Sequence, residues 1–165
     1  MLPRTMATTH SPADISGRTP LPESLNETEG WYLLTIYRLS NRDDARVRTG
    51  ELAAELEISP GSVTEMLAKL SAADFVRYEK YNGVETRARG TSIAESLAWR
   101  QCVVVAFFDR VLGYELDSRT AYRIGFSLPR EAIGRLERQV GSPRPDACHR
   151  IRPDSGNCFV TACAE

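Results

Sequence analysis

Two short amphipathic segments joined by a tight turn, within Val47–Leu70 (VRTGELAAELEISPGSVTEMLAKL), constrain the fold of this chain most strongly. Apolar residues recur at helical spacing in Glu51–Leu56, and again at i, i+3, i+4 and i+7 from Val63. Between these segments, Ser59 is a predicted N-cap, and Pro60 takes the first helical position. The pattern predicts a helix-turn-helix, the unit that places its second helix in the major groove of DNA.

The sequence period changes directly after this unit. Phe75–Lys80 alternates loosely, Tyr81-Asn82-Gly83 contains an Asn-Gly turn, and Val84–Arg87 can return as a second strand. A β-hairpin at this place predicts a winged helix, whose hairpin tip reaches the DNA backbone or minor groove. The alternative is a hairpin that only covers the three-helix core. DNA contact is favoured by four basic residues: Arg77, Lys80, Arg87 and Arg89.

Further helices are predicted on both sides of the winged helix. One runs over Glu29–Ser40, with Asn26 or Thr28 as its N-cap. After the hairpin, the apolar pattern predicts helices over Thr91–Leu112, Asp117–Ile124 and Glu131–Val140.

The segment Cys102–Phe108 of the long helix is apolar on nearly every side. A helix that is hydrophobic on every face must be buried on every face. A second copy of the chain is the most economical cover in a protein of this length. We therefore expect a homodimer, with an interface at Val103, Val104, Phe107 and Phe108.

The predicted fold is mainly α, with an N-terminal winged helix-turn-helix of three helices plus a hairpin, followed by a helical dimerisation domain. We expect the DNA-binding domain at residues 27–90 and the dimerisation domain at 91–141. Residues 1–26 show little periodic hydrophobicity and are expected to form a disordered tail. Residues 142–165 are expected to form a tail, which holds three of the four cysteines.

Composition limits the classes of function. The net charge is −1, so affinity for DNA must come from local placement of basic groups. No apolar run approaches the roughly 18 residues of a membrane span, and no secretory signal pattern is present. A cytoplasmic protein without membrane contact is expected. An enzyme is not expected, because the sequence has no nucleophile-and-base pairing, phosphate loop or paired metal-binding histidines.

The order of these elements resembles the iron- and manganese-dependent repressors, the family of the diphtheria toxin repressor and the manganese transport regulator. The matching strings are YLLTIYRLS, VRTGELAAELEISPGSVTEMLAKL and FVRYEKYNGV, with a weaker match through LPREAIGRLE. The resemblance covers about residues 27–140. It implies a homodimeric transcription regulator, a repressor, that binds a double-stranded DNA operator in response to divalent iron or manganese.

By resemblance, the start of the second helix of the helix-turn-helix faces DNA. Its small hydroxyl side chains and its N-terminus suit phosphate oxygens. Glu65 is the outward residue best placed to accept a hydrogen bond from a cytosine amino group, or else it is a solvent-exposed helix former. The predicted DNA-binding residues are Thr49, Ser59, Gly61, Ser62, Thr64, Glu65, Lys69, Lys80, Tyr81 and Asn82.

The metal-ligand positions of the family are replaced in this sequence. By resemblance, they correspond to Trp31 and Leu34 in the first helix, Gln101 and Val105 in the long helix, and Tyr122, Gly125 and Phe126 after it. The two histidines, His10 and His149, lie outside the matching region. We therefore do not expect the family's usual pair of metal sites to be intact.

Three interpretations of the control of this protein stay open. The first is a relocated metal site, because thiolates and an imidazole suit zinc, iron or an iron–sulfur cluster. The second is a thiol switch among the same cysteines. In the third, the cysteines have no such role. The candidate residues are Cys102, Cys148, His149, Cys158 and Cys163.

The competing classes of function are a metal-independent or thiol-redox-responsive regulator, and a winged-helix protein-interaction module without operator binding. The near-neutral charge of the winged-helix part favours the interaction module. The intact SPGSVTEM string favours a DNA-binding regulator.

Overall fold

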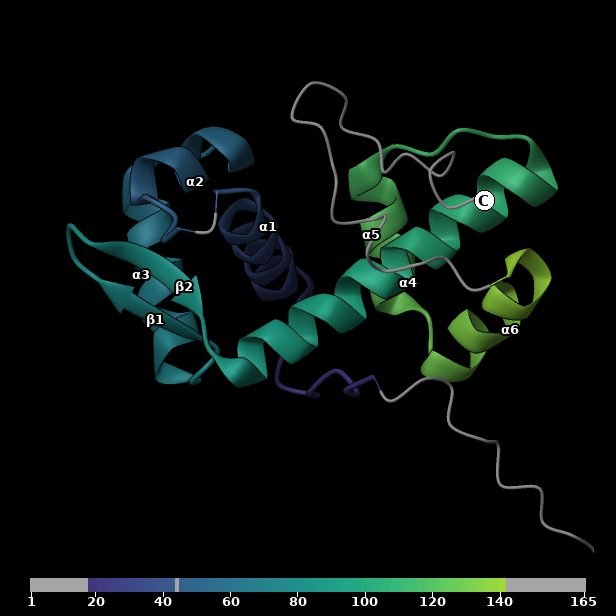
Figure 1. Ribbon diagram of the computed structural model, residues 1–165, viewed down its shortest axis with the longest axis horizontal. Helices are drawn as coiled ribbons and strands as arrows, with labels where there is room; N and C mark the ends of the chain where they lie inside the picture. Colours follow the sequence, from purple (N-terminus) through teal and green to yellow (C-terminus); the bar gives the residue numbers. More distant parts are fainter. Residues whose placement is uncertain (1–17, 44, 142–165) are drawn as a thin grey trace, which may run out of the picture.

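A computed structural model describes residues 18–43 and 45–141 (Figure 1). Its long helix α4 links a bundle with a hairpin at one end to two shorter helices at the other. This mainly helical fold with one antiparallel hairpin confirms the predicted fold class. In chain order the elements are α1 (Glu27–Asp43), α2 (Thr49–Leu56), α3 (Pro60–Ala72), β1 (Val76–Glu79), β2 (Gly83–Thr86), α4 (Ala88–Leu112), α5 (Ser118–Ser127) and α6 (Arg130–Val140).

Local signals explain where α1 and α3 begin. The Asn26 side chain accepts a hydrogen bond from the Glu29 backbone N–H at 2.9 Å, and the Glu29 carboxylate accepts one from the Asn26 N–H at 3.1 Å. This reciprocal pair is a capping box. Ser59 caps α3 by accepting from the Ser62 N–H at 3.3 Å, and Pro60 is the first helical residue. Both N-terminal predictions are confirmed at Asn26 and Ser59.

The hairpin pairs Val76 with Thr86 and Glu79 with Gly83. Its loop is Lys80-Tyr81-Asn82, so the predicted Asn-Gly turn is wrong, because Gly83 already belongs to the second strand. Gly83 has a φ of 91°, and a Cβ there would lie 2.7 Å from the Val47 carbonyl oxygen. Only glycine permits this close approach without strain. A backbone bridge between Val47 and Val84 then fixes the hairpin to the chain before α2.

The helix α4 takes part in two hydrophobic cores. Its first half, which includes Ile93 and Leu97, packs with α1, α2, α3 and the hairpin. Its second half, from Trp99 to Val105, packs with Ala121 of α5 and Ile133 of α6. One continuous helix therefore connects the winged helix to the C-terminal helices.

The apolar segment of α4 is covered within one chain. Val103 and Val104 are 0% exposed, in the core that α5 and α6 complete. This corrects their expected place at a dimer interface, because a side chain buried within one chain has no surface to offer a second copy. Phe107 and Phe108 are only half-buried.

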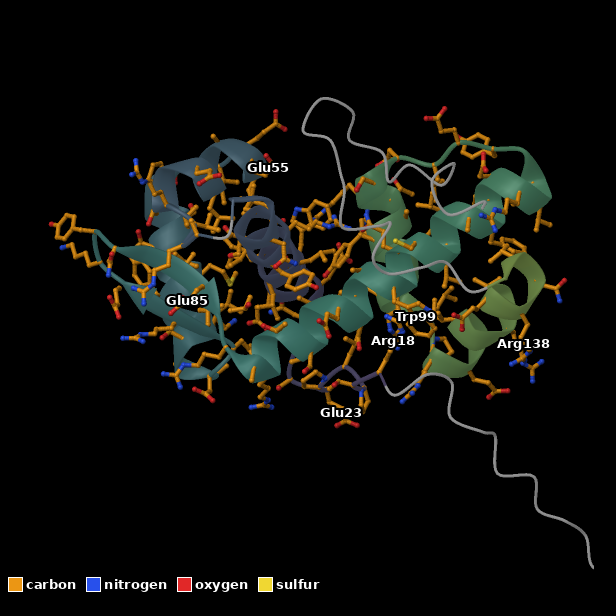
Figure 2. The ribbon with its side chains drawn as sticks, in the orientation of Figure 1. Arg18, Glu23, Glu55, Glu85, Trp99 and Arg138 are labelled. Atoms are coloured by element: carbon orange, nitrogen blue, oxygen red, sulfur yellow. The ribbon has the colours of Figure 1, made fainter. Side chains whose placement is uncertain are left out.

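The segment before α1 lies along α4. The Ser96 hydroxyl donates to the Thr19 carbonyl oxygen at 2.7 Å, and Leu25 is buried. The Arg18 guanidinium lies 5.1 Å from the centre of the Trp99 ring. Figure 2 labels both side chains beside α4. The predicted disorder of residues 1–26 therefore does not extend to residues 18–26. Residues 1–17 lie outside the described part of the chain.

Burial of Val104 within one chain gives a test of the fold. We expect Val104→Glu to remove the cooperative thermal transition, because an unpaired buried charge costs more than about 4 kcal/mol. Ala88→Glu is the control on the same helix, because Ala88 is exposed at the first position of α4. It should keep both the helical circular dichroism signal and the transition. A Val104→Glu protein that melts like the parent would contradict this packing.

Candidate nucleic-acid interface

The N-terminal turn of α3 is open to solvent. Ser59, Gly61 and Ser62 are exposed, and a Cβ at Gly61 would meet only the Ser59 hydroxyl, 4.0 Å away. The Ser59 and Ser62 hydroxyls lie 2.9 Å apart. Small side chains therefore leave the helix N-terminus accessible, where the backbone N–H groups and the helix dipole favour an anion. A phosphate group of DNA has the charge and size for this position.

The outward face of α3 carries Thr64 and Glu65, both exposed. The Thr64 hydroxyl donates to the Pro60 carbonyl oxygen at 3.0 Å, so its oxygen can still accept a hydrogen bond. Within the described part of the chain, no hydrogen bond or ion pair engages the Glu65 carboxylate. Glu65 can therefore accept hydrogen bonds from a base edge without first breaking a contact in the protein.

Lys69 has a different position from the other predicted DNA-binding residues of α3. Its ammonium group lies 2.6 Å from the Glu29 carboxylate, which is also part of the capping box of α1. Burial alone would raise the pKa of Glu29, but hydrogen bonds from Lys69 and Asn26 outweigh it and lower this pKa. Lys69 therefore connects α3 to the start of α1, in addition to being exposed.

The hairpin tip presents Lys80, Tyr81 and Asn82. Tyr81 is 96% exposed and has a φ of 69°, a conformation uncommon for residues other than glycine. The Lys80 ammonium lies 5.2 Å from the centre of the Tyr81 ring. A cation and a flat aromatic ring therefore project together from the tip. The Asn82 amide instead donates to the Glu79 carboxylate at 2.7 Å, within the hairpin.

Ion pairs hold the hairpin in shape behind its tip. Arg46 bridges Glu79 and Glu85, with N–O distances of 2.8 and 2.9 Å. The Asn82 amide and Arg46 lower the pKa of Glu79 to about 2, so this carboxylate stays charged at neutral pH. The Arg46 guanidinium is therefore paired within the protein. Lys80, at the tip, is exposed.

Thr49 is the first residue of α2 and is half-buried. It follows Arg48, an exposed residue that is not among the predicted DNA-binding residues. The Arg48 side chain makes no capping hydrogen bond to α2. The signal for it was available in the sequence, as a basic residue directly before a predicted helix of a DNA-binding unit.

The positions that correspond to the family's metal ligands do not fit a metal ion. Trp31, Leu34 and Val105 have no ligating atom. The Gln101 side-chain oxygen accepts from Arg38, and the Tyr122 hydroxyl donates to the Glu27 carbonyl oxygen at 2.6 Å. Among residues 18–43 and 45–141, no group of three or more His, Cys, Asp or Glu is placed to hold a metal.

The alternative metal ligands of the sequence analysis lie mainly outside the described residues. These are Cys148, His149, Cys158 and Cys163. Cys102, which lies within the described residues, is buried in α4.

Comparisons with known proteins identify the winged helix. Residues 24–84 match the family described as "Iron dependent repressor, N-terminal DNA binding domain". Over 84 residues, 51% of this chain, the sequence is 33% identical to the HTH-type transcriptional regulator MntR of Shouchella clausii. The chain spans 57% of the length of that curated relative.

Solved structures extend the likeness to the C-terminal helices. The manganese regulator SloR is 26% identical, with a TM-score of 0.61 over 70% of this chain and 54% of SloR. The IdeR protein of T. acidophilum, at 17% identity, shares the fold with a TM-score of 0.63 over 84% of this chain and 63% of its own. No helix among the described residues is both long and apolar enough to cross a membrane.

By name, MntR is a transcriptional regulator and SloR is a manganese regulator, which agrees with the expectation that this chain is not an enzyme. The chain is therefore similar to the iron- and manganese-dependent repressors, and its residues 24–84 match the model of their N-terminal DNA-binding domain.

Proposed function

We propose that this protein is a sequence-specific, DNA-binding transcription regulator, a repressor, that acts as a homodimer. The single observation that carries the proposal is the open N-terminal turn of α3, with Glu65 unengaged on its outward face. The exposed hairpin tip supports it, because Lys80 and Tyr81 project there together. Phosphate contacts at the turn and tip position the protein, and side chains on α3 read bases.

The homodimer rests on an apolar surface at the C-terminal end of α4. Val111, Leu112 and Tyr114 are each more than half exposed, and Phe107 and Phe108 are half-buried beside them. Exposed apolar groups gathered in one place favour contact with another protein surface. Two copies that meet here would carry two recognition helices, which suits an operator with two half-sites.

Iron or manganese, which the family resemblance implies, has no fitting ligand set at the corresponding positions of this chain. Manganese appears in the names of relatives, including the regulator SloR. The proposal here therefore concerns DNA binding itself and is independent of a metal.

Base reading by Glu65 is testable with sequences selected from random DNA. We expect Glu65→Gln to change the preferred base at one position of each half-site. A carboxylate only accepts hydrogen bonds and so selects a base with a donor, whereas an amide both donates and accepts. The expected loss of discrimination is about 1–3 kcal/mol. Glu131→Gln makes the same charge change on the exposed surface of α6 and should leave the preference unchanged. An unaltered preference in Glu65→Gln would remove Glu65 from the reading residues.

Contact between the hairpin tip and phosphate predicts a different behaviour for Lys80. Lys80→Ala should weaken binding to all sequences alike and reduce the slope of log K against log salt by about 1. Arg138→Ala, which removes an exposed charge from α6, should leave this slope unchanged. Fluorescence anisotropy over a series of salt concentrations measures both. Equal slopes in Lys80→Ala and the parent would place the hairpin tip away from DNA.

The dimer surface is testable by sedimentation. Leu112→Glu should release monomers that keep their helical content, because Leu112 is 55% exposed and packs little within its own chain. Leu112→Met keeps an apolar side chain of similar volume and should stay dimeric. A parent protein that sediments as a monomer, or a Leu112→Glu variant that stays dimeric, would refute this interface.

A further inference from the structure

We infer that side chains at the junction of α1, α4 and α5 hold the winged helix against the C-terminal helices, so that the DNA-binding arrangement needs no metal ion. This inference rests on the proposed function and concerns the control of the same site. We call these side chains the junction cluster. Its members are Trp31, Arg38, Gln101, Ser118, Arg119 and Tyr122.

The first half of the junction cluster is a chain of hydrogen bonds through Gln101. This side chain is 0% exposed, in the middle of α4. Its oxygen accepts from Arg38 of α1, and its nitrogen donates to the Ser118 carbonyl and hydroxyl oxygens at 2.5 and 2.8 Å. Gln101 thus joins α1 to the start of α5. A buried amide with these partners is satisfied and rigid, whereas its loss would leave buried polar groups unpaired.

The second half of the junction cluster is a pair of aromatic rings, tilted by 54° to each other and covered by a cation, which we call the stack for short. The Trp31 and Tyr122 ring centres are 4.9 Å apart. The Arg119 guanidinium lies 4.6 Å from the Trp31 ring centre and 5.7 Å from that of Tyr122. One Arg119 nitrogen, Nη1, is buried without a hydrogen-bond partner among the described residues. A position over ring faces explains it, because the negative face of an aromatic ring attracts a cation.

Close packing between α1 and α5 accompanies this stack. A Cβ at Gly30 would lie 2.5 Å from the Tyr122 hydroxyl oxygen. Any side chain at position 30 would therefore collide with this hydroxyl. The hydroxyl then donates to the Glu27 carbonyl oxygen at 2.6 Å. Desolvation raises the pKa of Tyr122, so its hydroxyl keeps its proton even above the pH at which an exposed tyrosine ionises.

The charges of the junction cluster oppose a bound cation. Arg38 and Arg119 bring positive charge to the place that a metal would occupy by family resemblance. The Gln101 oxygen already accepts a hydrogen bond from Arg38. The Tyr122 hydroxyl already donates one to the Glu27 carbonyl oxygen. The nearby Glu27 carboxylate already faces Arg123 at 3.2 Å and Arg119 at 3.8 Å. A metal ion at Glu27 would have to displace Arg119 and Arg123, and it would have to break the hydrogen bonds of Gln101 and Tyr122.

The continuity of α4 gives the junction its effect on DNA binding. Because α4 is one helix from the hairpin to its apolar C-terminal end, fixing α1 and α5 against it fixes α3 relative to the proposed dimer surface. The spacing of two recognition helices in a dimer is then set by the protein itself.

Removal and addition of metal test the inference on the full chain. Affinity for selected DNA should change less than about twofold between EDTA and excess manganese or ferrous iron, under reducing conditions. Tightening of about fivefold or more, the range of a coupled effector, would overturn the inference. Hydrogen exchange at residues 27–38 and 118–126 should also be the same with and without metal. Increased protection there on adding metal would likewise overturn it.

A matched pair of variants tests the role of the stack. Arg119 and Arg123 both face the Glu27 carboxylate, but only Arg119 covers the aromatic rings. Arg119→Ala should raise hydrogen exchange at residues 27–38 and 118–126 and weaken DNA binding by about three- to tenfold. Added manganese should not restore DNA binding in this variant. Arg123→Ala should leave both measurements near the parent values. Parent-like exchange in Arg119→Ala would overturn the role of the stack.

These measurements separate the inference from the proposed function. A chain that binds no DNA under any condition refutes the proposed function. Hydrogen exchange with and without metal still decides the state of the junction in that case.

Discussion

The need to bury the middle of α4, Ser96–Ala106, on every side determines how the rest of this chain is arranged. Fourteen of its residues are buried, along most of a helix of 25 residues. No single small core covers such a length, so the chain wraps its first half with the winged helix and its second half with α5 and α6. The two cores share one rigid axis as a result. The position of the recognition helix is therefore coupled to the C-terminal helices through a rod and not through a linker.

Along this axis, polar groups are buried only where they have partners. Arg100 of α4 donates to the Gly125 and Leu128 carbonyl oxygens at 3.0 and 2.7 Å and so closes the C-terminal end of α5. Gln101, the next residue, joins α1 to the beginning of α5. Two neighbouring side chains thus hold both ends of α5, and they orient it on α4 more strictly than apolar contact would.

Much of the winged helix was predictable because its signals are local. Ser59 with Pro60, and Asn26 with Glu29, act within one turn of their own helices. The cover of Val103 and Val104 was predicted wrongly, because an apolar helix face indicates that something covers it but not which segment does. The weakly apolar α5 and α6 supply it. The junction cluster was equally hidden, since Arg38 and Gln101 lie 63 residues apart, and Glu27 and Tyr122 lie 95 apart.

The first turn of α1 contacts both the recognition helix α3 and the C-terminal helix α5. On one side, Glu29 binds Lys69 of the recognition helix. On the other, the Glu27 carbonyl oxygen and Gly30 receive the Tyr122 hydroxyl of α5. Helix ends fray more readily than helix centres. The turn that Asn26 caps therefore takes part in two separate contacts, and any event that unwinds it breaks the Glu29–Lys69 ion pair and the Glu27–Tyr122 hydrogen bond together.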